Sequence, residues 1–188
     1  MKTPPQLDFD QSYAWFFDID GTLLEFAETP EQAHVSENLR ELLSRVQQHA
    51  DQALALITGR SIASADSLFA PLKLPTAGQH GFERRGPQGK LHYLGANSLP
   101  EDELQAILAI ENRHPGTLIE NKGGCVAVHY RRVPELGESV IQLVEDIAAS
   151  LKPDYETLKG NNVIEIKRAN CNKGHAVRAY MEREPFLG

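Results

Sequence analysis

The sequence predicts an α/β fold, in which a Rossmann-like parallel sheet covered by helices carries an inserted α+β unit with an antiparallel sheet. Apolar runs at 13–17, 53–57 and 75–77 predict three strands, and helical patterns separate them. Strands that alternate with helices are typical of parallel sheets, because each crossover lays a helix on the sheet. After residue 82 the pattern changes to paired short strands, which predicts the inserted unit.

The elements of the parallel sheet follow in chain order. Residues 13–17 are apolar and aromatic on both faces, which indicates a buried strand. Ser36 is a candidate N-cap for a helix whose apolar residues recur at helical spacing from 39 to 46. The second buried strand, 53–57, leads into a helix that we expect to end at Phe69, shortly before a proline.

The inserted unit is predicted from hairpins and amphipathic helices. Residues 82–94 predict a hairpin, with Gly86 and Gly89 near its turn. Ser98 and Glu101 have the spacing of a capping box, so a helix is expected to begin there. The other expected elements are strands at 117–120 and 124–131, a helix at 140–151, a hairpin at 155–168 and a final helix at 173–183.

These elements divide the chain into three segments. Residues 1–96 are expected to form the first part of the α/β core, 97–167 the α+β cap, and 168–188 a return segment that leaves the core incomplete. If the cap moves on the core, its hinges are expected near Gly95 and at 168–172.

Composition excludes several classes of function. The net charge is −7 and no Lys/Arg-rich run occurs, so we expect no nucleic-acid partner. No apolar stretch has the length needed to span a membrane, and residues 1–11 are polar, without a secretion segment. Cys125 and Cys171 form no disulfide framework and suit a reducing compartment. The sequence therefore predicts a cytoplasmic protein, and a monomer if it is complete.

Residues 18–22, which read Asp-Ile-Asp-Gly-Thr, carry the clearest chemical signal because they follow a buried strand directly. Ligands of open α/β sheets bind beyond the carboxyl ends of the strands, where Asp18 and Asp20 would project. One carboxylate can attack phosphorus in line, and the other can handle the proton of the leaving group. Gly21 permits a sharp turn, and the amides of its neighbours can face a phosphate. An ordinary strand-end turn is the alternative.

This motif resembles the first motif of the haloacid-dehalogenase superfamily of phosphatases. Residues 58–60, Thr-Gly-Arg, resemble its second motif, and residues 172–174, Asn-Lys-Gly, resemble its third. The resemblance narrows to the trehalose-6-phosphate phosphatases, whose segments occur here in order and over most of the chain. The segments that carry it are 15–22, 56–60, 78–81, 120–122, 128–131 and 163–166. It implies a haloacid-dehalogenase core, incomplete at its C-terminus, with an inserted cap.

The resemblance also implies catalytic roles. Asp18 would be the nucleophile that forms an aspartyl-phosphate, and Asp20 would protonate the sugar oxygen and then activate water. The implied cofactor is Mg²⁺, bound by the Asp18 carboxylate and the Asp20 backbone carbonyl. Thr58 would donate its hydroxyl and amide to phosphate, and Lys173 would supply a positive charge there. The alternatives are a helix N-cap for Thr58 and a solvated side chain for Lys173.

The cap is expected to select the substrate, a small sugar phosphate, and to exclude water. The resemblance places Glu120, Lys122 and Glu165 on sugar hydroxyls, as acceptors paired with a donor. His129 and Arg131 share one strand face and are further candidates, although they could instead form the wet side of a half-exposed sheet.

Four residues complete the candidate substrate contacts: Gly21, Thr22, Arg60 and His80. Arg60 could instead make a structural ion pair, and His80, which lies close to two glycines, could instead brace its loop.

The superfamily's fourth motif, an acidic pair after a further strand that adds Mg²⁺ ligands, has no counterpart in this sequence. The resemblance therefore implies a chain truncated before that motif, with 13–17 as an open, apolar sheet edge. Either the full activity belongs to a longer parent, which we favour, or this chain is the mature species, with weak Mg²⁺ binding and little turnover.

The function that follows from the resemblance is Mg²⁺-dependent hydrolysis of trehalose 6-phosphate to trehalose and phosphate, a step of trehalose biosynthesis. A phosphatase for another sugar phosphate shares the same catalytic residues, because the chemistry lies in the core and selection in the cap. A non-catalytic sugar-phosphate binder and a phosphotransferase or mutase are the remaining alternatives.

Overall fold

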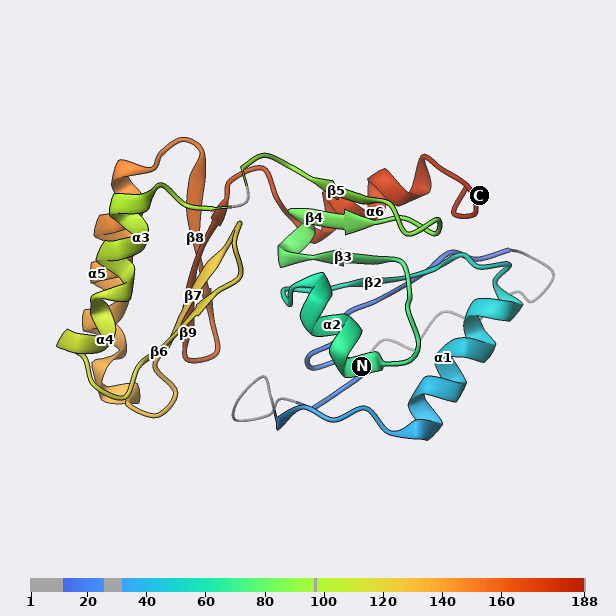
Figure 1. The fold of residues 1–188 in the computed structure, drawn as a ribbon, viewed down its shortest axis with the longest axis horizontal. Helices are drawn as coiled ribbons and strands as arrows, with labels where there is room; N and C mark the ends of the chain where they lie inside the picture. Colours follow the sequence, from blue (N-terminus) through green and yellow to red (C-terminus); the bar gives the residue numbers. More distant parts are fainter. Residues whose placement is uncertain (1–11, 26–31, 97, 188) are drawn as a thin grey trace, which may run out of the picture.

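The computed structural model describes residues 12–25, 32–96 and 98–187. The expectation about residues 1–11 lies outside the described residues. Figure 1 shows an elongated molecule in two parts, with a larger sheet on the right and a smaller sheet, backed by helices, on the left. None of the helices in the described part of the chain combines the length and the apolar character that crossing a bilayer requires.

The larger sheet has five strands in the order β1-β2-β3-β4-β5. The strands β1 (Trp15–Phe17), β2 (Leu54–Ile57) and β3 (Thr76–Gly78) run parallel, as predicted. The hairpin of β4 (Glu83–Arg85) and β5 (Leu91–Tyr93) extends the sheet antiparallel to β3. The predicted hairpin therefore belongs to the core sheet and makes it mixed.

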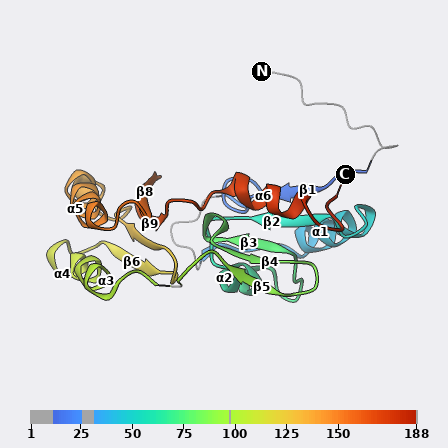
Figure 2. The same ribbon diagram turned by 90° about the horizontal axis from the view of Figure 1, so that it is seen from above.

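Helices cover both faces of this sheet, which Figure 2 shows from above. Helices α1 (Glu37–His49) and α2 (Ile62–Phe69) pack on the face that carries Leu54 and Leu56, and α6 (Lys173–Met181) packs on the opposite face. This alternation along β2 explains why the strand is apolar throughout: both of its faces are covered. Helix α2 ends at Phe69 as predicted, while α6 ends two residues before the predicted end at 183. Ser36 caps α1 by accepting a hydrogen bond from the Leu39 amide at 3.2 Å.

Strand β1 lies at the edge of the five-stranded sheet and pairs with β2 alone within the described residues. Its three residues are only half-buried, which differs from the buried strand that the apolar pattern predicted, while its place at the sheet edge agrees with what the resemblance implied. The reason is that the apolar pattern reports which faces are covered, and it does not report whether a neighbouring strand closes the edge.

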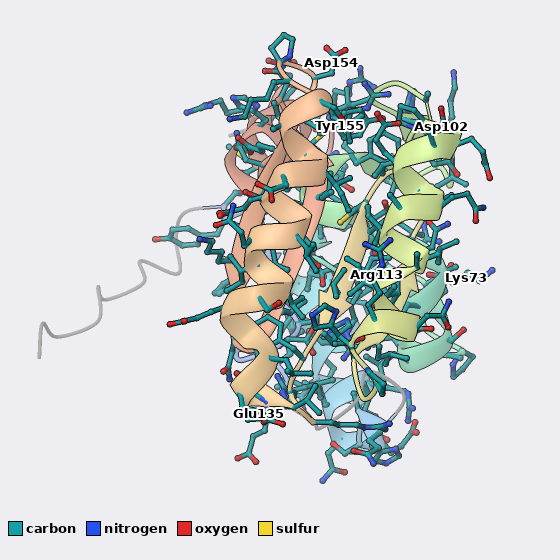
Figure 3. The ribbon with its side chains drawn as sticks, turned by 90° about the vertical axis from the view of Figure 1, so that its left-hand side faces the viewer. Lys73, Asp102, Arg113, Glu135, Asp154 and Tyr155 are labelled. Carbon is teal, nitrogen blue, oxygen red and sulfur yellow. The ribbon has the colours of Figure 1, made fainter. Side chains whose placement is uncertain are left out.

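The smaller sheet has four antiparallel strands in the order β6-β7-β9-β8. In chain order they are β6 (Leu118–Asn121), β7 (Val126–His129), β8 (Tyr155–Gly160) and β9 (Val163–Arg168). The helices α3 (Glu101–Leu108), α4 (Ile110–Arg113) and α5 (Gly137–Ser150) cover one face of it. Figure 3 looks onto these helices, with α5 beside α3 and α4. The other face of the sheet is left for the core and its ligands.

The start of α3 differs from the prediction. Its N-cap is Pro100, which offers no side-chain hydrogen bond, so the capping box from Ser98 to Glu101 does not form. The first turn instead carries Glu101, Asp102 and Glu103, whose negative charges stabilise the helix by interacting with the positive end of its dipole.

The chain passes twice between the sheets, from β5 to α3 and from β9 to α6. The two crossings lie close together, since a Cβ added to Gly95 would lie 3.5 Å from the guanidinium carbon of Arg168. We propose these crossings as the hinges and the division into 1–96, 97–167 and 168–188 as the domain organisation. Residue 97 itself lies outside the described residues.

Candidate active site

A cavity of about 390 Å³ lies between the core and the cap. Its volume is within the range of roughly 300–1,000 Å³ that is common for small-molecule sites. The predicted site residues that line it are Asp18, Asp20, Arg60, His80, Glu120, Lys122, His129, Arg131, Glu165 and Lys173. Core and cap thus contribute to one site, as expected for a catalytic centre covered by a selective cap.

Asp18 and Lys173 meet on the core side of the cavity. Asp18 follows β1, and Lys173 is the first residue of α6, whose N-cap is Asn172. The Lys173 Nζ donates to Asp18 Oδ2 at 2.5 Å, and the Ile19 amide donates to Asp18 Oδ1 at 2.9 Å. The side chains remain 41% and 34% exposed, so the pair is fixed in position and still open to a ligand. The alternative of a merely solvated Lys173 is not what the geometry shows.

Asp20 and Arg60 form a bidentate ion pair beside it. The Arg60 Nε donates to Asp20 Oδ2 at 2.9 Å, and its Nη2 donates to Oδ1 at 2.8 Å. Planar two-point pairing of this kind fixes both side chains in orientation as well as in charge. Arg60 therefore makes the ion pair that the sequence left open, while both residues still line the cavity.

Thr58 does not line the cavity and is fully buried. Its amide donates to the Ala77 carbonyl at 2.9 Å, and its Oγ1 accepts from the Arg60 amide at 3.1 Å. The amide is thus committed to the pairing of β2 with β3, which overturns the expectation that it donates to phosphate. The N-cap alternative is also wrong, because Ser61 caps α2.

Gly21 and Thr22 do not line the cavity either, although both are exposed. Gly21 has a φ of 77°, the left-handed conformation that its lack of a side chain permits. Its amide donates to the Leu24 carbonyl at 2.7 Å, and the Thr22 amide donates to the Ile19 carbonyl at 3.3 Å. The sharp turn is as predicted, but the Thr22 amide, one of the two neighbouring amides that were expected to face a phosphate, donates within the turn.

On the cap side, Glu165 on β9 is the centre of a buried charge network. Lys122 Nζ donates to its Oε1 at 2.9 Å, and His80 Nε2 lies 2.7 Å from its Oε2. Burial raises the pKa of Glu165, but the hydrogen bond to His80 and the charge of Lys122 outweigh it and lower the pKa to about 2. Burial likewise lowers the pKa of Lys122, and the charge of Glu165 reverses this to a net increase. Both groups are therefore held in their charged forms.

Glu120 and His129 extend the network along the sheet. His129 Nε2 lies 3.2 Å from Glu120 Oε2, and Lys122 Nζ lies 3.6 Å from the same oxygen. Burial raises the pKa of Glu120, while its bond to His129 and the charge of Lys122 lower it overall. Arg131 donates to the Asn161 carbonyl at 3.3 Å. His129 and Arg131 thus face the cavity, on a wall that carries both hydrogen-bond donors and acceptors.

Sequence reasoning missed the contribution of the turn between β8 and β9. Residues 158–161 and Val163 line the cavity beside the charge network. The turn was predicted only as a turn. Strand alternation offered a partial signal, because Val163 lies two residues before Glu165 and on the same face of β9. The missing information was the closeness of this turn to the core.

Residues 16–187 match the family model described as trehalose-phosphatase. The match covers nearly the whole described chain, including both sides of the cavity. The chain belongs to the trehalose-phosphatase family. This agrees with the resemblance found in the motifs, and the enzymes of the family are phosphoric monoester hydrolases.

Among the family's curated members, a probable trehalose-phosphate phosphatase from Sinorhizobium fredii is 42% identical over 178 residues, which are 94% of this chain and 67% of that protein. The trehalose-6-phosphate phosphatase of Escherichia coli is 36% identical over 182 residues, 96% of this chain and 68% of that protein. This chain therefore spans about two thirds of the length of each of these two relatives.

The fold is also shared with a solved structure of the family. The C-terminal domain of the C. albicans trehalose-6-phosphate phosphatase superposes with a TM-score of 0.81 at 23% identity, over 93% of this chain and 64% of that one. The core and cap therefore have the haloacid-dehalogenase-like α/β fold that was predicted.

The residues around Asp18 fit a loosely held magnesium ion. The described part of the chain contains no group of three or more His, Cys, Asp or Glu residues that could hold a metal. Mg²⁺ commonly binds through one or two carboxylates and fills its other positions with water and substrate phosphate. The half-exposed Asp18 carboxylate meets that minimal requirement.

Proposed function

We propose that this chain hydrolyses trehalose 6-phosphate to trehalose and phosphate, as a step in making trehalose. The observation that carries the proposal is the shared cavity, in which the accessible Asp18–Lys173 pair faces the charge network around Glu165. A nucleophile suited to phosphorus thus lies opposite groups suited to sugar hydroxyls. The names of the two curated relatives support trehalose 6-phosphate as the sugar phosphate.

In the proposed first step, a carboxylate oxygen of Asp18 attacks phosphorus and forms an O–P bond. The bond from phosphorus to the sugar oxygen breaks, and that oxygen takes its electron pair together with a proton from Asp20. In the second step, Asp20 removes a proton from water, whose oxygen attacks phosphorus. The bond between phosphorus and the Asp18 oxygen breaks, which releases phosphate and restores the Asp18 carboxylate. Lys173 orients Asp18 and stabilises the negative charge of the phosphoryl oxygens.

Asp20 must leave Arg60 to act in this way. Both of its oxygens accept hydrogen bonds from Arg60 in the structure, so neither is directed to a leaving group. We infer that the ion pair stores Asp20 beside the reacting centre. When the pair opens, the Asp20 carboxylate takes up a proton from solvent water, and the protonated carboxyl can then donate it to the sugar oxygen.

The proposed cofactor is Mg²⁺, held by the Asp18 carboxylate and the Asp20 backbone carbonyl. When bound, it neutralises the charge of the phosphate and so lowers the repulsion of an anionic nucleophile. The small number of candidate ligands in the described residues supports weak binding, and hence low turnover of this chain at ordinary Mg²⁺ concentrations.

In the proposed complex, Glu120 and Glu165 accept hydrogen bonds from sugar hydroxyls, and Lys122, His129 and Arg131 donate to sugar oxygens. The largely buried charges of Lys122 and Glu165 favour a ligand with many hydroxyls, because each hydroxyl can serve as donor and acceptor. A related phosphatase for another sugar phosphate would use the same residues with a different spacing.

A second candidate is a non-catalytic sugar-phosphate binder. The observation that favours it is the absence of a multi-carboxylate metal site from the described residues. The Asp18–Lys173 pair opposes it, because an anionic side chain directed at phosphate weakens simple binding.

We also propose the cytoplasm as its location, since Cys125 and Cys171 are buried free thiols, which suit a reducing compartment. We propose that the protein acts as a monomer and without nucleic acid.

The test is phosphate release from trehalose 6-phosphate with and without Mg²⁺, beside an Asp18→Asn control and a panel with sucrose 6-phosphate and glucose 6-phosphate. Mg²⁺-dependent release that Asp18→Asn abolishes, and that is fastest with trehalose 6-phosphate, is the expected result. Equal rates across the panel would refute the substrate. Binding without any release, from folded protein, would favour the binder.

A further inference from the structure

The turn between β6 and β7, residues 122–125, brings the cap into direct contact with the core. Figure 1 shows the tips of these two strands pointing toward the core beside β3. Lys122 Nζ donates to the Gly59 carbonyl at 3.3 Å, and the Lys122 carbonyl accepts from Gln79 Nε2 at 2.7 Å. Both the side chain and the backbone of one cap residue are therefore fastened to the core.

Gln79 belongs to η2 (Gln79–Gly81), the single turn that follows β3. It is 2% exposed and has a φ of 48°, which is uncommon for a residue with a side chain. Its Oε1 is buried without a partner among the described residues. A buried amide with an unpaired acceptor is unfavourable, so an apolar side chain would serve the core alone at least as well. What the amide adds is the hydrogen bond to the cap.

Gly124 makes the second contact, and there the fit is steric. A Cβ added to Gly124 would lie 2.3 Å from Cε1 of Phe82 in the core, closer than the 3.0 Å that real Cβ atoms essentially never go below. Gly124 does not have a positive φ. The glycine is therefore required by the space that the Phe82 ring occupies and not by the backbone conformation.

Phe82 has little freedom to move away. It is 1% exposed, its ring packs at 6.0 Å from that of Tyr93, and its amide donates to the Gln79 carbonyl at 3.1 Å. Tightly packed aromatic rings in a core resist displacement, because repacking them forces neighbouring side chains from their rotamers. A side chain at Gly124 would therefore move the cap turn and not the ring.

We propose that Gln79 and Gly124 are positioning residues that set how closely the cap closes on the core. Because the same turn carries Lys122, its position also sets where Lys122 and Glu165 lie relative to Asp18. The inference rests on the proposed function for its kinetic consequence, although the docking itself does not depend on it.

The kinetic test compares Gly124→Ala with Gly86→Ala, a matched substitution whose Cβ would meet only one side-chain atom at an ordinary 3.8 Å. We expect Gly124→Ala to lower kcat/KM for trehalose 6-phosphate by about tenfold to a hundredfold, as a displacement near 1 Å can. For p-nitrophenyl phosphate, which is too small to need the sugar contacts, kcat/KM should change less than about twofold. Gly86→Ala should change neither.

A second variant, Gln79→Met, removes the hydrogen bond to Lys122 and keeps the length of the side chain. It should also lower kcat/KM for trehalose 6-phosphate relative to kcat/KM for p-nitrophenyl phosphate, by a smaller factor than Gly124→Ala does. Because it introduces no clash, it remains informative if Gly124→Ala folds poorly.

Hydrogen–deuterium exchange tests the docking without any activity. In both variants, amides of residues 79–82 and 122–125 should exchange faster than in the wild-type chain and in Gly86→Ala, while those of β2 and α5 stay unchanged. The inference would be overturned if Gly124→Ala and Gln79→Met matched Gly86→Ala both in their amide exchange rates and in the ratio of kcat/KM for the two substrates. A wild-type chain that hydrolyses neither substrate would refute the proposed function alone, since the exchange result would still decide the docking.

Discussion

Lys173 Nζ lies 2.5 Å from Asp18 Oδ2, although 155 residues separate the two along the chain. The start of α6 and the end of β1 bring them together at one end of the core sheet. A lysine fixed in this way can hold the carboxylate in the direction of attack and offset the charge of the phosphoryl group.

Replacement of Lys173 by Met should lower kcat for trehalose 6-phosphate by about 10²–10³-fold, the usual cost of losing one fixed stabilising group. The melting temperature should change little, because the ion pair is substantially exposed. Steady-state kinetics and thermal unfolding measure the two effects. Lys90→Met is the control and should leave kcat unchanged, because Lys90 is exposed and lies in the loop between β4 and β5. Equal losses of kcat in both variants would contradict the role of Lys173.

Asp20→Asn should separate the two chemical steps. With p-nitrophenyl phosphate, whose leaving group needs no proton, the first turnover should persist as a burst of p-nitrophenolate. Later turnovers should slow by about 10²–10⁴-fold, because no base activates water. Stopped-flow absorbance records both phases. A variant that loses the burst as well would show that Asp20 is needed before water enters.

The stability of the fold should depend on Glu165 at low pH. The pKa of Glu165 is about 2 in the folded chain, below its usual value of 4.5, so folding favours its ionised form. A group with a lowered folded pKa stabilises the fold above its unfolded pKa, and that contribution is lost as the pH falls from about 4.5 toward 2. The full contribution is up to about 3 kcal/mol.

Urea unfolding at pH 7, 4.5 and 3 measures this effect as the stability difference between the wild-type chain and Glu165→Gln. The difference should be largest at pH 7 and shrink toward pH 3. Glu145→Gln, which removes a partly exposed partner of Lys159, should show no such trend. A difference that does not vary with pH would mean that Glu165 is not held ionised by His80 and Lys122.

The two thiols should be inert in the folded chain. Burial raises the pKa of Cys125 and of Cys171, so the reactive thiolate is scarce at neutral pH. Titration with a thiol-reactive disulfide reagent should detect neither thiol in native protein and both in urea. Rapid labelling of native Cys125 would show that the turn between β6 and β7, residues 122–125, opens often.

Local sequence determined the elements and the position of the chemistry. Apolar runs and helical spacing identified β2, α1 and α6, because each pattern reflects burial of one or two faces. The meeting of Asp18 and Lys173 was implied only by the resemblance carried by the motifs at 18–22 and 172–174, since the local patterns by themselves do not predict it.

Tertiary structure decided which partner each of these polar groups has. Arg60 pairs with Asp20 across 40 residues, and the Thr58 amide bonds to Ala77 instead of facing a phosphate. His80 meets Glu165 across 85 residues, from core to cap. Such pairings depend on distances between elements that pack only after folding. Sequence patterns report the burial of a residue along its own element, and they carry no information about which distant group will lie within hydrogen-bonding distance of it.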